Sequence, residues 1–274
     1  MNRLPSLFIS HGAPSSLEDE EWMKSLRNLG EELGDIRGII ILSAHWVERG
    51  LYAGPLLPSS LIYDFWGFPE RLYRVRYPAP SGADLLPILQ KLPEIGPVTP
   101  APSRGLDHGM WVPLIGLRPK ADIPVLGLSL PGTDPGRLYS LGQALAPLRD
   151  EGILVIGSGG LTHNLGALIA GENHAIAPWA QEFDQWVVRK LESSDTTSLL
   201  DFRKEAPNAS LSHPTIEHFA PLFVAMGAAG EGFHVTFPVD IFRYGSLSLR
   251  SVAFWNPPPH CLADLEATGS LRIQ

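Results

Sequence analysis

Three short apolar runs, each followed by small residues and then a histidine, most constrain the fold of this chain. The runs are Leu7-Phe8-Ile9, Ile39-Ile40-Ile41-Leu42 and Ile153-Leu154-Val155-Ile156, and the histidines after them are His11, His45 and His163. Continuous apolar runs rich in β-branched residues are typical of strands buried on both faces of a parallel sheet. The carboxyl ends of such strands meet at one edge, where α/β proteins bind ligands. The sequence therefore predicts that the three histidines share one site.

Helical segments are predicted between these strands. The first has Trp22, Leu26, Leu29 and Leu33 at helical spacing, with Ser15 or Ser16 as its cap. Further helices are predicted over residues 84–92, 110–117, 135–148 and 178–191, and further strands around residues 51–53 and over 123–130. Residues 233–237 and 246–254 alternate in polarity, which indicates antiparallel strands. We expect an α/β fold with a central, mostly parallel sheet flanked by helices and antiparallel strands added near the C-terminus.

Length and charge limit the function classes. The 274 residues suit one large α/β domain, and we expect a single domain over residues 1–256 with a surface tail over 257–274. The net charge of −8 without a cationic cluster disfavours nucleic acid and anionic membranes as partners. No apolar run approaches membrane-spanning length, and the single cysteine, Cys261, cannot form a disulfide within the chain. We expect a cytoplasmic protein.

Five of the nine histidines have contexts that suit a metal site. His11, His45 and His163 follow strands, while His108 and His218 stand beside Asp107 and Glu217 at the start of apolar segments. Neutral imidazole binds zinc, iron, copper and nickel, and a small set of protein ligands leaves positions open for substrate. For His174, His213, His234 and His260 we expect solvated or locally bonded side chains.

Other interpretations of these residues stay open at this point. The five histidines can be buried residues bonded to backbone carbonyls, or the catalytic groups of a hydrolase without metal. The segment from Gly157 to Gly160 can be an anion-binding loop, although it lacks the GxGxxG spacing. The aromatic segment from Tyr63 to Pro69 is either a loop pinned to the core by its rings or a pocket wall for a flat ligand.

An ordered set of short motifs resembles the class III extradiol ring-cleaving dioxygenases, the LigB-like superfamily, and within it the 4,5-DOPA extradiol dioxygenase branch. The motifs are Ser10-His11-Gly12-Ala13-Pro14, Ser43-Ala44-His45-Trp46, Asp64-Phe65-Trp66-Gly67-Phe68-Pro69, Tyr77-Pro78-Ala79-Pro80, Asp107-His108-Gly109, Thr162-His163-Asn164-Leu165, Glu217-His218 and Gly245-Ser246-Leu247-Ser248. They span about residues 4–254, so the resemblance covers nearly the whole predicted domain.

The resemblance implies a role for each histidine of the set. His11 and His45 match metal ligands, and His163 matches an acid/base catalyst that is a further ligand in some zinc-bound members. His108 matches a catalytic histidine beside the substrate. The third ligand, usually a glutamate in the superfamily, is matched in this branch by His218, with the adjacent Glu217 as the alternative.

The resemblance also implies the reaction and its cofactor. We expect an extradiol dioxygenase that opens the ring of a catechol-type substrate, DOPA-like or related, with O₂. Phe65, Trp66 and Phe68 are the expected flat apolar wall for the ring. Fe(II) is the expected working metal because Zn(II) has no redox chemistry, although Zn(II) also suits the histidines. The partners are then a small aromatic diol and O₂, and assembly into a homo-oligomer is compatible with the sequence. The rival functions are a zinc-dependent hydrolase or amidase and a non-catalytic binding protein on the same fold.

Overall fold

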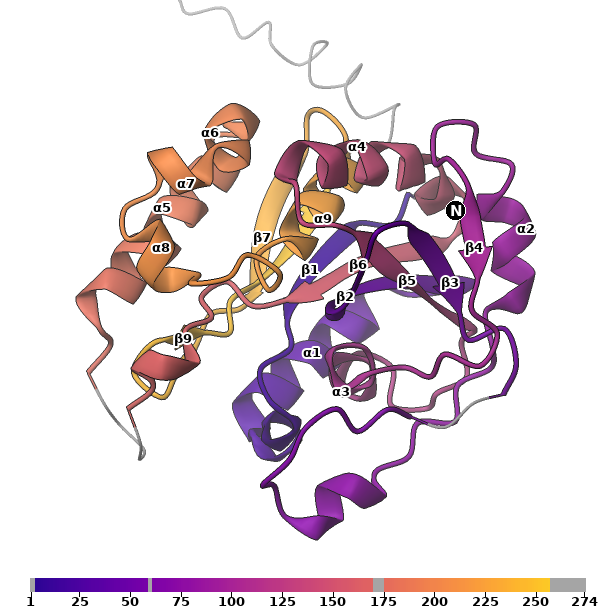
Figure 1. Ribbon diagram of the computed structural model, residues 1–274, viewed down its shortest axis with the longest axis horizontal. Helices are drawn as coiled ribbons and strands as arrows, with labels where there is room; N and C mark the ends of the chain where they lie inside the picture. Colours follow the sequence, from indigo (N-terminus) through magenta and orange to yellow (C-terminus); the bar gives the residue numbers. More distant parts are fainter. Residues whose placement is uncertain (1–2, 59–60, 170–174, 257–274) are drawn as a thin grey trace, which may run out of the picture.

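A computed structural model describes residues 3–58, 61–169 and 175–256. Its centre is an eight-stranded sheet with the order β4-β3-β5-β2-β6-β1-β10-β7 (Figure 1). The strands of this sheet are β1 (Ser6–Ser10), β2 (Gly38–Glu48), β3 (Leu51–Gly54), β4 (Val98–Pro100), β5 (Val125–Pro131), β6 (Ile153–Gly159), β7 (His234–Val239) and β10 (Ser251–Trp255). A second, small antiparallel sheet pairs β8 (Phe242–Arg243) with β9 (Leu247–Ser248).

The direction of the strands confirms the predicted fold class. The central strands β5, β2, β6 and β1 all pair in parallel. The late strands β10 and β7 are added antiparallel beside β1. At the other edge β3 is antiparallel to β5, and β4 pairs in parallel with β3. The sequence analysis predicted the antiparallel C-terminal strands but not β4 or β8.

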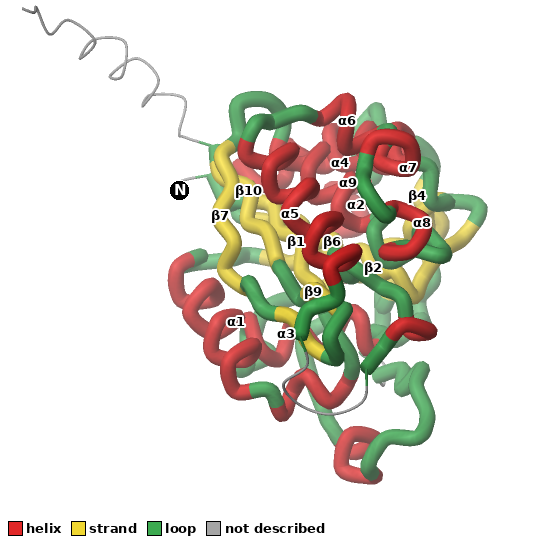
Figure 2. Tube along the Cα trace, turned by 90° about the vertical axis from the view of Figure 1, so that its left-hand side faces the viewer, coloured by secondary structure: helices red, strands yellow, loops and turns green. Residues whose placement is uncertain are grey.

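Helices cover both faces of the sheet. They are α1 (Glu20–Glu32), α2 (Leu86–Leu89), α3 (His108–Leu117), α4 (Pro135–Leu145), α5 (Pro178–Glu192), α6 (Thr196–Leu200), α7 (Phe202–Glu205), α8 (Ala209–Ser212) and α9 (Pro221–Ala229). Side chains of α1 and α3 form one apolar core with the sheet, and those of α2, α4, α5 and α9 form the other. Figure 2 shows α1 and α3 below the strands, with α4 and α9 above them.

This two-sided cover explains why the strand sequences are continuously apolar. In β2, Ile39 and Ile41 point into the core of α1 and α3, whereas Ile40 and Leu42 point into the core of α4 and α9. All four side chains are fully buried. Burying each one contributes about 1.5–3 kcal/mol relative to exposure, so both faces of this strand stabilise the fold.

Several predicted boundaries were wrong. The helix expected to begin at Ser15 or Ser16 is a 3₁₀ turn (Pro14–Glu18) followed by α1, whose cap is Asp19. The Asp19 carboxylate accepts a hydrogen bond from the Trp22 backbone N–H at 3.1 Å. The Ser16 hydroxyl instead accepts from the Ala13 N–H, which holds the preceding turn.

Other segments differ in regularity from the prediction. The helix expected over residues 84–92 is a 3₁₀ turn (Ala83–Leu85) and the short α2, and α4 passes into 3₁₀ geometry (Ala146–Glu151). Residues 246–254 form two strands rather than one, because Arg250 at the break pairs with the buried Asp184 of α5 at 2.9 Å. The polar segment 193–209, for which no element was predicted, contains α6, α7 and the start of α8.

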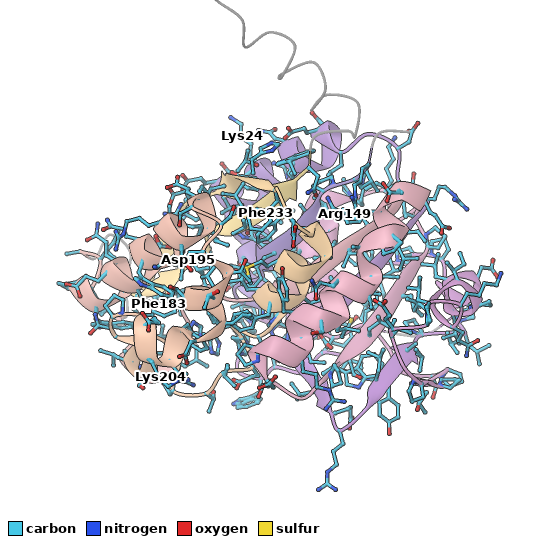
Figure 3. All side chains as sticks on the ribbon, turned by 90° about the horizontal axis from the view of Figure 1, so that it is seen from above. Lys24, Arg149, Phe183, Asp195, Lys204 and Phe233 are labelled. Carbon is cyan, nitrogen blue, oxygen red and sulfur yellow. The ribbon has the colours of Figure 1, made fainter. Side chains whose placement is uncertain are left out.

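Two buried side chains connect the parts of the fold (Figure 3). Phe183 of α5 packs against Phe202 and Phe219, which joins the helices α5 to α8 to the segment before α9. Arg149 is fully buried and donates to the carbonyls of Leu4, Ala228 and Ala229, so it links the N-terminal segment to the end of α9.

The expected tail over 257–274 lies outside the described residues. Among the described helices, none is long and apolar enough to span a membrane.

Candidate metal centre and active site

The carboxyl-end edge of the sheet brings together all five histidines singled out in the sequence. His11 follows β1 directly, His45 lies near the end of β2, and His163 comes shortly after β6, which lies between those two strands. His108 begins α3, and His218 lies in the turn before α9. The ring centroids of His11 and His45 are 5.1 Å apart, and both lie 5.0–5.4 Å from that of His218. The His108 ring is 4.1 Å from His45, and the His163 ring is 3.4 Å from His218.

Hydrogen bonds at Nδ1 fix the tautomers of His11 and His45. The Ser158 hydroxyl donates its only hydrogen to the Gly109 carbonyl, so it accepts from the His11 Nδ1–H at 3.0 Å. The Asp64 carboxylate lies 3.3 Å from His45 Nδ1 and is an acceptor there. Both rings therefore have an unprotonated Nε2, and these two atoms are 3.2 Å apart. Second partners of this kind set the tautomer in metal-binding histidines.

The distance between the facing Nε2 atoms indicates whether His11 and His45 fit one metal ion. Two nitrogen lone pairs at 3.2 Å repel each other unless a cation lies between them. Zinc–nitrogen bonds of about 2.0–2.1 Å place two neighbouring ligands of one ion about 3.0–3.4 Å apart. The observed separation falls in this range, so His11 and His45 fit a divalent metal.

Asp64 is a functional residue that the sequence analysis quoted in a motif but gave no role. One of its oxygens accepts from both the backbone N–H of His108, at 3.0 Å, and His108 Nδ1, at 2.8 Å. Its other oxygen faces His45 Nδ1. Burial alone raises the pKa of Asp64, but the hydrogen bonds and the charge of His108 outweigh burial and lower the pKa to about 2. The ionised carboxylate therefore orients two imidazoles of the site at once.

Glu217 does for His218 what Asp64 does for His45. Its carboxylate faces His218 Nδ1 at 3.3 Å and accepts from the Thr215 hydroxyl at 2.8 Å. The hydrogen bond from His218 is the main cause that lowers the pKa of Glu217 to about 2. His218 is buried, and its Nε2 remains free. Two sets of three side chains have ligand atoms within 4.8 Å of one another: His11, His45 and His108, and His163, Glu217 and His218.

Burial keeps His11, His45, His163 and His218 neutral near neutral pH. Burial, followed by repulsion from the neighbouring histidines, lowers the pKa of His45 to about 2. The same two causes lower the pKa of His163 to about 3 and hold that of His11 well below its usual value. Burial also lowers the pKa of His218, against the opposing effect of Glu217. Neutral rings have lone pairs available to a metal or a proton.

Two glycines allow the histidine-bearing segments to approach one another. A Cβ on Gly159 would lie 2.0 Å from the His218 carbonyl oxygen, and the neighbouring Gly160 N–H donates to that oxygen at 2.8 Å. A Cβ on Gly109 would lie 2.9 Å from the His45 ring and 3.1 Å from the His11 ring. The segment from Gly157 to Gly159 is thus a buried strand end rather than an anion-binding loop.

A cavity of about 540 Å³ opens over the five histidines. The three aromatic residues predicted as its wall all line it. Phe65 packs edge-on against His108, with centroids 5.8 Å apart, and against Phe68 at 5.4 Å. Trp66 lines the cavity at its mouth, because its side chain is 87% exposed. The size and the mainly apolar lining are typical of small-molecule sites.

The histidines outside the predicted site differ from one another. His234 is exposed, in agreement with its place on the polar face of a strand. The expectation for His213 was wrong, because His213 is fully buried and its Nε2 lies 2.8 Å from the carbonyl oxygen of Leu161, 52 residues away in the sequence. His174 and His260 lie outside the described residues.

The fold and the histidine cluster define a metal-dependent α/β enzyme, and comparison with known proteins gives its family. Residues 4–254 match the model of the catalytic LigB subunit of aromatic ring-opening dioxygenase, and the chain belongs to this family. It is an extradiol ring-cleavage dioxygenase, which uses an aromatic substrate and O₂. The family favours this function over the zinc hydrolase and the non-catalytic binding protein.

Several similar proteins cover almost the whole chain. The 4,5-DOPA dioxygenase extradiol of Beta vulgaris is 40% identical over 90% of this chain and 96% of its own length. The protein of the same name from Escherichia coli K12 is 37% identical over 91% of this chain and 94% of its own. The crystal structure of an uncharacterized protein from Escherichia coli K12 superposes with a TM-score of 0.78 and 34% identity, covering 92% of this chain and 99% of the other.

Proposed function

We propose that this enzyme opens the ring of a DOPA-type catechol and that His11, His45 and His218 hold Fe(II) for the reaction. One observation carries the proposal: histidines with unprotonated Nε2 atoms lie together beneath an apolar cavity. Relatives 37–40% identical to the chain are named as 4,5-DOPA dioxygenases, which supports the substrate class. Three neutral ligands leave positions open for two substrate oxygens and O₂.

The third ligand has two candidates, His218 and His108. Both have Nδ1 engaged by a carboxylate and both lie close to His45. We assign His218 to the metal, as the sequence resemblance implies. The edge-on contact of His108 with Phe65 supports a place for His108 beside the substrate ring. There the Nε2 of His108 can form a hydrogen bond with a catechol hydroxyl.

The stacking of His163 on His218 supports an acid/base role for His163. The two rings are 3.4 Å apart and within 4° of parallel. A histidine ligand holds its metal close to the plane of its own ring, so two rings stacked in this way do not share one ion. His163 is neutral at neutral pH, since burial and the neighbouring His218 lower its pKa to about 3. It can therefore accept a proton without being a permanent ligand.

The proposed chemistry divides the work between metal and protein. When bound, Fe(II) supplies a redox-active template that brings catechol and O₂ together. His163 takes the proton of a catechol hydroxyl and returns it at a later step, and such general acid–base catalysis contributes about 10²–10⁴-fold. Phe65 and Phe68 bind the face and edge of the ring, and the buried strand ends exclude water from below.

Reconstitution with different metals tests the proposed function. Metal-free protein is loaded anaerobically with Fe(II) or with Zn(II), and O₂ uptake is measured with DOPA and with 4-methylcatechol. We expect uptake and a ring-opened product only with Fe(II), because Zn(II) has no redox chemistry. Equal turnover with Zn(II), or no turnover of any catechol with Fe(II), would contradict the proposal.

Replacement of His163 by asparagine separates its two possible roles. We expect His163→Asn to keep stoichiometric metal and anaerobic catechol affinity while turnover falls by about 10²–10⁴-fold. The exposed His234→Asn is the matched control and should retain turnover. A His163→Asn protein that loses its metal would show that His163 is a ligand.

A further inference from the structure

Exposed apolar side chains gather at the mouth of the metal cavity. Of the nine large apolar side chains that are exposed in the described part of the chain, four line this cavity. They are Trp66, Leu165, Leu168 and Tyr244, with exposed fractions of 87%, 61%, 39% and 44%. Single exposed apolar residues are ordinary on a protein surface, but a group of them at one opening is typical of a ligand-binding site. We call these four residues the apolar rim.

Hydrogen bonds between two chain segments hold one part of the apolar rim in place. The backbone N–H of Ile169 donates to the Tyr244 carbonyl at 3.0 Å. The Ser246 hydroxyl donates to the Ala167 carbonyl at 3.2 Å. These bonds join the segment of the two rim leucines to the segment of the rim tyrosine, so the three side chains stand on a hydrogen-bonded backbone.

The remaining member of the apolar rim is anchored through its neighbour in the sequence, Phe65. The Phe65 ring packs against Tyr73, with centroids 4.7 Å apart, and against Phe68 at 5.4 Å. The adjacent Trp66 has no aromatic contact within the described part of the chain. Its indole therefore presents a large apolar surface that a bound molecule can cover.

The metal cavity offers no counter-charge to an anionic substituent. Among the described residues that line it there is no lysine or arginine, and the only acid is the ionised Asp64. The chain as a whole carries a net charge of −8. A carboxylate that enters the cavity therefore loses water without gaining a partner, which costs free energy. An uncharged apolar substituent instead gains free energy when it covers the rim.

The cavity is also larger than catechol itself. Its volume is about 540 Å³, and pockets of roughly 300–1,000 Å³ hold drug-sized ligands. We propose that the apolar rim binds an uncharged apolar substituent on the catechol ring, so that the enzyme prefers alkyl- or aryl-substituted catechols to those whose side chain ends in a carboxylate. This preference rests on the proposed catechol cleavage and narrows its substrate class. DOPA, whose side chain bears a carboxylate and an ammonium group, is then cleaved less efficiently than an alkyl catechol.

A matched pair of catechols tests this preference. The substituents of 4-(3-methylbutyl)catechol and 3-(3,4-dihydroxyphenyl)propionate have the same shape but end in an isopropyl group and a carboxylate, respectively. In Fe(II)-loaded enzyme we expect kcat/KM for the alkyl compound to exceed that for the propionate, for DOPA and for 4-methylcatechol by about tenfold or more, because each buried methylene contributes up to about fourfold. Anaerobic calorimetry on Zn(II)-loaded protein should give the same order of affinities without turnover.

Two rim variants and one control locate the effect. Leu165→Ser and Trp66→Ser should each lower the ratio of kcat/KM for 4-(3-methylbutyl)catechol to that for 4-methylcatechol by about two- to fourfold, since each removes a partly exposed apolar contact. Because the ratio compares two substrates of one protein, a lower content of active enzyme does not affect it. Leu57→Ser is the control and should leave the ratio unchanged, because Leu57 is 58% exposed, much like Leu165, but does not line the metal cavity.

The two measurements separate failure of the preference from failure of the function. If the alkyl compound and the propionate bind and react equally well, the rim does not select apolar substituents. An equal change of the ratio in Leu57→Ser and in the rim variants would refute the assignment of these residues. If the affinities follow the expected order but Fe(II)-loaded protein cleaves no catechol, the proposed function is wrong while the apolar preference stands. Absence of binding by every catechol would refute both.

Discussion

The Asp64 carboxylate contacts two imidazoles, those of His45 and His108. Replacing Asp64 by asparagine exchanges one of its oxygens for an NH₂ group. One carboxylate oxygen accepts both hydrogen bonds from His108, at 2.8 and 3.0 Å, and the other faces His45 Nδ1 at 3.3 Å. An asparagine carbonyl oxygen can keep the contacts to His108, but its NH₂ group then faces the Nδ1–H of His45. Two donors in contact repel, so His45 moves its proton to Nε2 or turns away. Either response removes the lone pair that faces His11 at 3.2 Å.

The expected size of this effect follows from the contact of Asp64 with Nδ1 of His45, a proposed metal ligand. Losing such a partner typically lowers metal affinity or activity by about 10–100-fold, equivalent to about 1.4–2.7 kcal/mol. Metal affinity is measured by competition with a chromophoric chelator, using Zn(II) as a redox-silent probe, and circular dichroism checks the fold. Asp84→Asn, an exposed carboxyl that does not line the cavity, is the control. Asp64→Asn affinity within about twofold of the unmodified protein would refute the reasoning.

Three further predictions concern the third ligand and two buried side chains, His213 and Arg149. His218→Ala should lose stoichiometric metal while Glu217→Gln retains it with weaker affinity, and the reverse result in metal analysis would assign the carboxylate as ligand. Below pH 6.5 the unfolded chain protonates His213 whereas burial lowers its folded pKa to about 3, so the free energy of unfolding falls as pH falls. In urea unfolding of metal-free protein, His213→Gln should reduce this loss by up to about 1.4 kcal/mol per pH unit, and an unchanged slope would contradict the assignment. Arg149→Leu leaves three buried carbonyls without a donor, and urea unfolding should show a loss of at least about 3 kcal/mol; a loss below about 1 kcal/mol would be inconsistent with these contacts.

The histidines after the strands were predictable because their signal is local. An apolar run that ends in small residues marks the end of a buried strand, and parallel strands bring such ends to one edge. His11 and His45 were placed together on this ground alone, and the structure confirms that they are neighbours. His108 and His218 were singled out by a weaker local signal, an adjacent carboxylate at the start of an apolar segment, and the family resemblance then implied a role for each.

The partners that orient these histidines were missed because their contacts are distant in sequence. Ser158 lies 147 residues from His11, and Asp64 lies 44 residues from His108. The cap of α1 was misplaced for a related reason. Ser15, Ser16 and Asp19 are all good caps by local preference, and Asp19 is also held by Arg243, 224 residues away. A single sequence gives no measure of which distant residues pair with each other.

The carboxylates of this site contact the Nδ1 atoms of histidines and are not themselves among the three candidate metal ligands. Asp64 and Glu217 are both held ionised, with pKa values of about 2, and each accepts from the Nδ1–H of an imidazole. They fix orientation and tautomer, but His11, His45 and His218 themselves are neutral. A set of three neutral ligands leaves the charge of a divalent ion uncompensated, whereas a set with one carboxylate compensates half of it. If His11, His45 and His218 hold the metal as proposed, this set would favour an anionic oxygen as a further ligand, and a catechol that gives its proton to His163 would provide one.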